Sequence, residues 1–522
     1  MRIFSAAKNE LYKTVFWIII CLGGMIVFFS PTENWSWDPS YYYAQIRSPI
    51  IENDLDFRNE TITNGVTTRV TVTGLQGSAW PVGPSLLWAP FFLLAHFIVL
   101  LINPAKATGF SFPYISLVAF GSALYGVIGV LILYKICRYY GNKYISIITT
   151  VLCLGATPLF YYIFRQPLMA HSTGFLVSAI MFLFYIRLTD NQISRDWSGL
   201  TFGVLLGLNF LMRWTGILFA IFPVTYFATQ IIKAVREKNS PESRFLIKQI
   251  CIMIAGFGLM ITPQMALWYR LYGRFLVIPQ GASTFVANIL PINTLKVFFD
   301  TNRGLLFWSP FVLIGMIGIF RIPKPEVRIS AAICLVSQVI LIGYRVDWFS
   351  GGVFGARYFI ELLPMLAVGF ICLVRGFSMK TAGQLLLAVC TIGLVVHQSV
   401  LIYAVEHPFD GYIDIVKYIL GQPLGVRWQL NSFIMLFRNP GQWLKPWLYD
   451  VQDRQTILIN LVAGVRDLRA YRIPGTAALL TPFAVIGVLW IRKYTNKINL
   501  LIILLGVIIY MVAWSFYYIV VG

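Results

Sequence analysis

The chain has 522 residues, of which 58% are apolar and only 12% are charged. Water-soluble globular proteins average about 25% charged residues, so this chain cannot cover a soluble surface. The composition predicts a multi-span membrane protein and excludes disordered, collagen-like and disulfide-framework classes. The net charge of +20 does not indicate a nucleic-acid partner, because Lys and Arg cluster in short gaps between apolar runs.

Apolar runs of about 20 residues, or somewhat fewer where short helices pack, predict membrane-spanning helices. The runs that qualify directly are 15–30, 113–134, 145–160, 171–188, 249–267, 306–320, 329–344, 359–374, 383–404, 475–491 and 498–520. The run 199–231 is too long for one span and is interrupted by Arg213 and Trp214, so we divide it into two short helices. We therefore expect an all-α polytopic protein with about 13 transmembrane helices.

The run 84–102 is also long enough to cross, and the basic residues decide its placement. If it does not cross, every short basic gap from 135–143 to 492–497 falls on the side of the N-terminus, as the positive-inside rule requires. We therefore predict an interfacial or re-entrant helix on the outer face, with a cytoplasmic N-terminus and an external C-terminus. In a bacterium the protein would lie in the inner membrane.

The outer side then carries the acidic residues and the long loops. Of the 21 Asp and Glu residues, 15 fall there. So do all of the long connections, which are 31–112, 268–305, 345–358 and 405–474. Long loops in compact proteins are usually functional or disordered, and these are rich in aromatic residues. The sequence therefore predicts an ordered working face outside the membrane.

Two acidic motifs lie in the first outer loop. Asp38 follows the first span among Trp and Tyr residues that include Tyr42. Partial desolvation there would raise the basicity of the carboxylate towards general-base work, although an Asp-Pro pair is also good helix-capping chemistry. Asp54 and Asp56 could hold a divalent cation through their oxygens, but a DxD pair is common by chance and also suits a solvated loop.

A glycine-rich segment, 347–358, precedes the span at 359–374. It begins with Asp347, contains three glycines, and ends with Arg357 and Tyr358. Glycine permits close approach of an anion to a helix N-terminus, and Arg357 adds a bidentate fork. The segment is therefore a candidate cradle for a lipid phosphate, and the alternative is a tight turn with a snorkelling arginine.

Other outer residues carry weaker signals. Charges near the membrane edge are costly unless they are paired or functional, so each outer arginine is either an interfacial anchor or a ligand. These arginines are Arg165, Arg213, Arg270, Arg274 and Arg303. His171 opens a span, where it is either a hydrogen-bonded cap or a substrate contact. Hydrolase, Walker and HExxH zinc motifs do not occur in the sequence.

Taken together, these motifs resemble those of GT-C glycosyltransferases, in particular bacterial relatives of the protein O-mannosyltransferases (family 39) and of the lipid A aminoarabinose transferase. The resemblance covers about the first 370 residues. It rests on Asp38 with Tyr42 and Tyr43, and on the segments 54–60, 80–90, 156–162, 169–171 and 351–357. It implies a GT-C-like bundle with interfacial helices in the first outer loop.

On this basis we expect a catalytic module over residues 1–375, which includes outer loop 31–112. Residues 376–522 would form C-terminal transmembrane helices with outer loop 405–474. The resemblance implies transfer of one sugar from a polyprenyl-phosphate donor to a lipid, glycan or protein acceptor on the outer face. Asp38 matches the position of the family base.

Relatives often carry a Lys two residues before their Pro-x-Gly-Pro motif, and here that position is Ala79. We therefore expect arginines to bind the donor phosphate, with Arg357, Arg303, Arg165 and Arg270 as the candidates. Further substrate or metal candidates are Asp54, Asp56, Tyr42, His171, Asp347 and Tyr358.

The implied chemistry is a single displacement. A phosphodiester is already a good leaving group, so one carboxylate base and cations for the developing charge suffice, and the anomeric carbon should invert. A divalent cation is optional, and no other cofactor is expected. The alternative functions are a secondary transporter or flippase of lipid-linked sugars, or an oligosaccharide ligase or polymerase. Transport is disfavoured because the mid-span segments are nearly free of charge apart from Arg213.

Overall fold

The computed structural model describes residues 37–60, 70–279, 285, 291–375, 381–406 and 415–424. These residues belong to one compact unit, which spans residues 31–447. The second unit, residues 1–30 and 448–522, lies outside the described residues, and so do the predicted spans at 15–30, 475–491 and 498–520.

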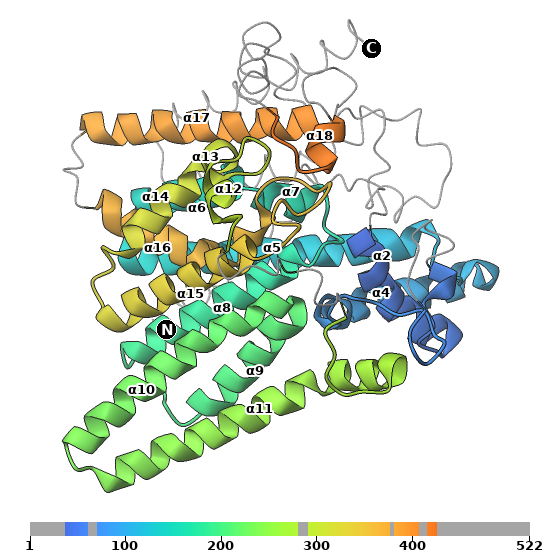
Figure 1. The fold of residues 1–522 in the computed structure, drawn as a ribbon, viewed down its shortest axis with the longest axis horizontal. Helices are drawn as coiled ribbons and strands as arrows, with labels where there is room; N and C mark the ends of the chain where they lie inside the picture. The colour runs from blue at the N-terminus through green and yellow to red at the C-terminus, as the bar shows by residue number, and fades with distance from the viewer. Residues whose placement is uncertain are drawn as a thin grey trace, which may run out of the picture. The chain divides into compact units, whose positions relative to one another are not determined.

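The described residues are almost entirely helical (Figure 1). Their longer helices are α2 (Trp37–Arg47), α4 (Gly83–Ile102), α5 (Phe112–Tyr140), α6 (Lys143–Gly155), α8 (His171–Thr189), α9 (Ser198–Met212), α10 (Ile221–Arg236), α11 (Ser240–Tyr272), α14 (Pro310–Ile319), α15 (Pro325–Gly343), α16 (Leu363–Val374) and α17 (Thr381–Glu406). Short helices are η1 (Ser48–Glu52), η2 (Pro104–Lys106), α7 (Leu159–Phe164), η3 (Trp214–Ala220), α12 (Thr294–Phe299), α13 (Leu305–Trp308), η5 (Arg357–Leu362) and α18 (Ile415–Ile419). Across these ranges the β-structure amounts to two isolated bridges, Val70 with Gln76 and Phe285 with Arg345.

Eight described helices are long and apolar enough to cross a membrane. They confirm an all-α, multi-pass membrane protein. The predicted spans at 113–134, 171–188, 249–267, 329–344, 359–374 and 383–404 each fall within one of them or extend beyond its end by a single residue. The helix Gly83–Ile102 also qualifies by length and composition, so its interfacial placement stays a prediction. The total of about 13 spans and the division at residue 375 also stay predictions.

Three of the predicted apolar runs are interrupted near a proline or an arginine. The prediction of two helices in 199–231 is confirmed: α9 ends at Met212, and Arg213 takes an extended backbone conformation. The predicted spans 145–160 and 306–320 are each shorter than expected. Helix α6 ends before Pro158, and α14 starts afresh at Pro310, because proline lacks the N–H that a continuing helix needs.

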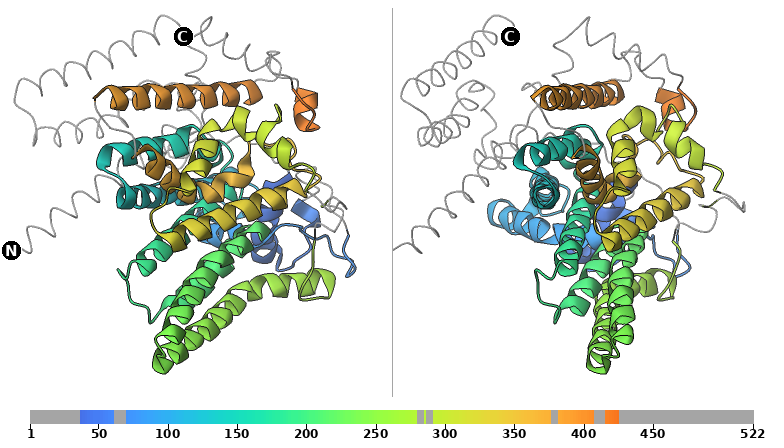
Figure 2. Two further views of the ribbon diagram at one scale, coloured as in Figure 1. Left: turned by 60° about the vertical axis from the view of Figure 1, so that its left-hand side comes forward. Right: turned by 90° about the vertical axis from the view of Figure 1, so that its left-hand side faces the viewer.

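Helices α9 and α11 pack along a line of small residues. Gly199, Gly203 and Gly207 recur every four residues on α9, and a Cβ atom at Gly203 would lie 2.3 Å from the Met253 carbonyl oxygen of α11. Such close backbone contact is typical of membrane helices that lack a hydrophobic driving force. Figure 2 shows these two helices running beside α10, with a bend in α11, which contains Pro263. The contact fixes the end of α9 at which Arg213 lies.

The helices that carry the candidate site are the most buried ones. Of the candidate spans, Arg357–Val374 is 89% buried and His171–Thr189 is 72% buried, whereas Ser240–Tyr272 is only 17% buried. Helix α8 also packs against α5, α9 and η5. Side chains on these two spans are therefore held by protein on most sides, which favours a fixed arrangement of their polar groups.

The substitution Gly203→Ala should destabilise the protein by about 1–3 kcal/mol, because the added methyl group overlaps backbone atoms that cannot move aside. Thermal unfolding of the purified protein in detergent would measure the loss. Gly258→Ala on α11 is the matched control, since a Cβ atom there meets no atom within 4 Å. Equal thermal stability of the two variants would contradict the close packing of α9 on α11.

Candidate active site

Asp38 and Arg357 form an ion pair, although 319 residues separate them in the chain. Asp38 lies in the first turn of α2, where the helix dipole favours a carboxylate. Arg357 opens η5, and its Nη1 donates to Asp38 Oδ2 at 2.8 Å. The side chains are 10% exposed at Arg357 and 19% at Asp38, so the pair is partly shielded yet reachable. The structure thus brings together the two residues on which the sequence interpretation depends.

The loop before Arg357 turns sharply around the guanidinium group. Ser350, Gly351 and Gly355 all have positive φ angles, and Arg357 Nη2 donates to the Ser350 carbonyl at 3.3 Å. At Gly355 a Cβ atom would lie 2.7 Å from Pro158, so a larger residue would be both strained and crowded. The glycines of this segment therefore shape a turn around Arg357.

Arg303 is hydrogen-bonded to the backbone of this loop. Its Nη2 donates to the carbonyls of Gly351 and Val353, both at 2.9 Å, and its guanidinium lies 3.4 Å from the centre of the Tyr418 ring. Burial lowers the pKa of Arg303, and the charge of nearby Arg357 lowers it further, although Tyr418 opposes both effects. Arg303 is thus close to Arg357, but its Nη2 group donates to the loop and its Nη1 group donates to Asn302.

The segment 156–162, part of the family resemblance, supports the same loop. Tyr162 donates its hydroxyl proton to the Phe354 carbonyl at 2.8 Å, and Tyr161 stacks on the Phe354 ring at 4.5 Å. The centres of the Tyr162 and His171 rings lie 4.4 Å apart. The aromatic residues of α7 therefore link the loop to the start of α8.

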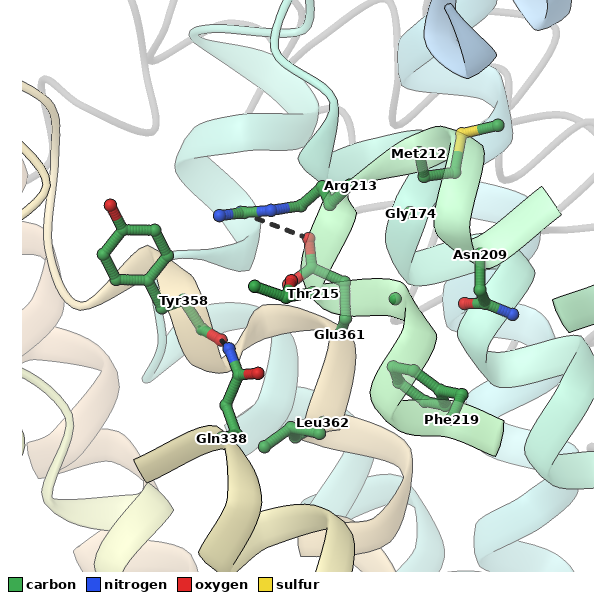
Figure 3. Close-up of a pocket in the computed structure, with 11 residues that line it drawn as sticks. Gly174, Asn209, Met212, Arg213, Thr215, Phe219, Gln338, Tyr358, Glu361 and Leu362 are labelled. Atoms are coloured by element: carbon green, nitrogen blue, oxygen red, sulfur yellow. Dashed lines mark hydrogen bonds and ion pairs between the residues drawn. The ribbon is translucent and has the colours of Figure 1, made fainter. Parts of the chain in front are cut away.

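A second polar cluster joins three helices. Arg213 Nη1, just beyond α9, lies 2.8 Å from His171 Nδ1 on α8. The same nitrogen lies 3.5 Å from Glu361 Oε1 on η5 (Figure 3). His171 Nδ1 is also 3.1 Å from the same glutamate oxygen. Because Nδ1 carries either a hydrogen or a lone pair, it can donate to Glu361 or accept from Arg213, but not both. The protonation of His171 Nδ1 therefore decides which of the other two side chains it is hydrogen-bonded to.

Tyr358 lies between the two clusters. Its ring is approached by the guanidinium carbons of Arg213 at 5.1 Å, Arg345 at 5.5 Å and Arg357 at 5.8 Å, all within cation–π range. Gln338 fixes its backbone through a 2.8 Å hydrogen bond to the carbonyl. This ring lines an open pocket with about 290 Å³ of space between atoms, open solvent included, and Arg213, Glu361 and Gln338 are among the other lining residues (Figure 3).

Tyr42 completes the site from α2. The side chain is buried and packs edge-on against Trp88 at 5.9 Å. Burial raises the pKa of the Tyr42 phenol, and Asp38 raises it further, while Arg213 and Arg357 act in the opposite direction. The phenol therefore stays neutral, and its electrostatic neighbours come from both polar clusters.

The remaining cation candidates lie in other surroundings. Arg165 is 1% exposed and grips Glu406 through Nε at 2.7 Å and Nη2 at 2.6 Å. Arg270 is exposed on the last turn of α11. The structure therefore does not group these two with Asp38 and Arg357.

The acidic candidates other than Asp38 hold local structure. Asp347 pairs with Arg345 through two 2.8 Å contacts. Asp54 accepts from the Ser48 hydroxyl and, at 3.1 Å, from the Asp56 backbone N–H. Asp56 accepts from the Gln76 backbone N–H at 2.9 Å. Asp54 and Asp56 thus close the turn after η1, which is the loop role that the sequence left open.

Glu361, Arg345 and Gln338 are site residues that the sequence interpretation missed. Glu361 lies inside the apolar run 359–374. An ionisable residue within a membrane helix is costly and marks a functional position by default, so this signal was available. Gln338 carried no comparable pattern.

Comparison with known protein families gives a match to part of the chain. Residues 110–240, which extend from α5 to the beginning of α11, match the family described as dolichyl-phosphate-mannose-protein mannosyltransferase. A comparison with curated proteins gives no match.

Three solved structures are similar to the chain at low sequence identity. ArnT from Cupriavidus metallidurans, bound to undecaprenyl phosphate, is 13% identical with a TM-score of 0.47, covering 91% of this chain and 80% of that one. The archaeal oligosaccharyltransferase AglB from Archaeoglobus fulgidus, in complex with an inhibitory peptide and a dolichol-phosphate, is 16% identical with a TM-score of 0.41, covering 85% and 60%. An apo oligosaccharyltransferase from the same organism is 14% identical with a TM-score of 0.39, covering 88% and 59%. The chain thus spans about three fifths of the length of the two archaeal structures.

The family match agrees with the resemblance that the sequence motifs predicted. The match extends over 131 of the 522 residues, so it shows a resemblance of this segment to the protein mannosyltransferases.

Proposed function

We propose that the protein transfers a single sugar from a polyprenyl-phosphate donor to a lipid, glycan or protein acceptor on the extracytoplasmic face, with inversion. The observation that carries the proposal is the ion pair between Asp38 and Arg357. It places a carboxylate that can act as a base next to a cation that can bind a phosphate. The family match supports the reaction class, since its description names a dolichyl-phosphate-linked sugar.

The ion pair also suggests how donor binding prepares the base. In the ion pair, Asp38 Oδ2 accepts a charge-assisted hydrogen bond from Arg357, so this oxygen is not free to meet an acceptor hydroxyl. A phosphodiester that binds Arg357 competes with Asp38 for the guanidinium N–H groups, because both are anionic acceptors. Arrival of the donor would therefore release Asp38 at the moment when a base is needed.

The reaction then needs one proton transfer. Asp38 takes the proton of the acceptor hydroxyl while the acceptor oxygen attacks the anomeric carbon of the donor sugar. The bond from that carbon to the phosphate oxygen breaks, and polyprenyl phosphate leaves with the electron pair. Arg357 stabilises the negative charge that grows on the phosphate in the transition state. In this proposal Arg303 keeps Arg357 in place through the loop, and donor contact does not require Arg165 or Arg270.

The substitution Asp38→Asn should lower sugar transfer by at least about 100-fold, because a positioned general base contributes about 10²- to 10⁴-fold. The amide oxygen still accepts from Arg357, so the protein should fold. The native gene would be deleted, and the wild-type or variant gene would be supplied in its place. Mass spectrometry of the cell-envelope glycans would then measure the effect.

Asp190→Asn is the matched control for this measurement. Asp190 follows the C-terminal end of α8, whereas His171 in the site starts this helix. Asp190 pairs with Lys324 at 2.5 Å, so the control also removes one carboxylate from an ion pair. It should leave the glycan product unchanged. Full product formation by Asp38→Asn would remove Asp38 from the mechanism.

The product should have the opposite anomeric configuration to the donor sugar. A single carboxylate base gives one displacement, whereas retaining glycoside hydrolases use a second carboxylate as a nucleophile about 5 Å from the first. Proton NMR coupling constants at the anomeric position of donor and product would show the outcome. Retention would contradict the single-displacement mechanism while leaving the identity of the donor open.

A further inference from the structure

The arginines around the glycine-rich loop differ in how many of their hydrogen-bond donors the protein uses. A guanidinium group has five N–H donors. Arg345 directs Nε and Nη2 at Asp347, and Arg303 directs both of its Nη groups at oxygens of the chain. Both terminal nitrogens of Arg303 thus have acceptors, and only its buried Nε finds none among the described residues, while Arg345 already pairs with a carboxylate.

Arg213 and Arg357 have donors in reserve. Within the part of the chain that the structure describes, the hydrogen bonds of Arg213 all leave from Nη1, and its side chain is 15% exposed. Arg357 has a buried Nε that finds no acceptor among the described residues. A buried donor without an acceptor costs free energy, so an anionic ligand that satisfies it gains affinity.

These two guanidinium groups lie close to the same aromatic ring. Their carbon atoms lie 5.1 and 5.8 Å from the centre of the Tyr358 ring, so they are no more than about 11 Å apart. Both also act electrostatically on the Tyr42 phenol. A phosphodiester offers several oxygens and can accept from two guanidinium groups at once.

The position of Arg213 is set by its two buried partners. Glu361 lies against α8 at Gly174, where a Cβ atom would be 3.2 Å from the Glu361 Oε1 atom. His171 is 2% exposed and lies one turn earlier on the same helix. Glu361 and His171 both contact the Nη1 group of Arg213. Its Nε and Nη2 groups are bonded to neither of them.

We propose that Arg213 is a second phosphate-binding residue, which together with Arg357 clamps the phosphate of the lipid-linked donor. Glu361 and His171 are the positioning residues that hold Arg213 beside Tyr358. This inference rests on the proposed function and adds to it the residues that select an anionic lipid carrier over a neutral one.

Binding of undecaprenyl phosphate to the purified full-length protein tests the clamp, with the neutral alcohol undecaprenol as the reference lipid. Arg213→Gln should weaken phosphate binding by about 10- to 100-fold, as expected for the loss of charge-assisted hydrogen bonds, and leave undecaprenol binding unchanged. Arg213→Lys keeps a charge for Glu361 and should also weaken binding, because it lacks the fork. Affinity equal to wild type in either folded variant overturns the clamp.

A double-substitution comparison tests the positioning role. Glu361→Gln should weaken phosphate binding about tenfold when Arg213 is present and add nothing in the Arg213→Gln background. A merely structural role would weaken binding by the same factor in both backgrounds, and that result overturns the positioning role. Glu242→Gln is the matched control, because it removes the partner of Arg195, which lies beyond the other end of α9.

The binding measurement separates this inference from the proposed function. Wild-type protein that binds undecaprenyl phosphate no better than undecaprenol overturns both. Wild-type protein that prefers the phosphate, with a preference that survives Arg213→Gln, overturns the clamp alone and leaves Arg357 as the phosphate contact.

Discussion

A partly shielded ion pair between two distant segments is the interaction on which the site depends. Taking Asp38 and Arg357 out of water costs several kcal/mol per charge, and only close geometry with further hydrogen bonds offsets that cost. The chain meets this requirement by directing Nη2 of the arginine at a backbone carbonyl and by placing the aspartate in the first turn of α2. A pair that contributes little to stability is well suited to exchange one partner for a substrate.

The surrounding residues restrict how the pair can move. Arg303, Tyr162 and Tyr418 each hold a carbonyl of the glycine-rich loop, so the backbone that presents Arg357 is fixed at several points. Behind it, the cluster around Glu361 joins α8, α9 and η5. We therefore expect the ion pair, rather than the loop, to change when the donor binds. This arrangement favours release of the carboxylate over a rearrangement of the backbone.

Much of this arrangement could be predicted from local sequence patterns. Apolar runs gave most of the described spans, and the interruption at Arg213 marked the end of α9. Asp38 and Arg357 each stood out by their neighbours, but no local pattern showed that they touch. The partnership of Glu361 with His171 was missed because it depends on how two helices pack. The breaks at proline were missed because a length criterion does not register a lost N–H donor.

The most direct test of the central claim is a cryo-electron microscopy structure of the full-length protein in lipid nanodiscs with undecaprenyl phosphate. The account predicts that the phosphate lies within hydrogen-bond distance of the Arg357 guanidinium, and that the Asp38 carboxylate has left it and faces the acceptor side. A phosphate bound elsewhere, or an intact pair between Asp38 and Arg357 with the lipid bound, would contradict the account.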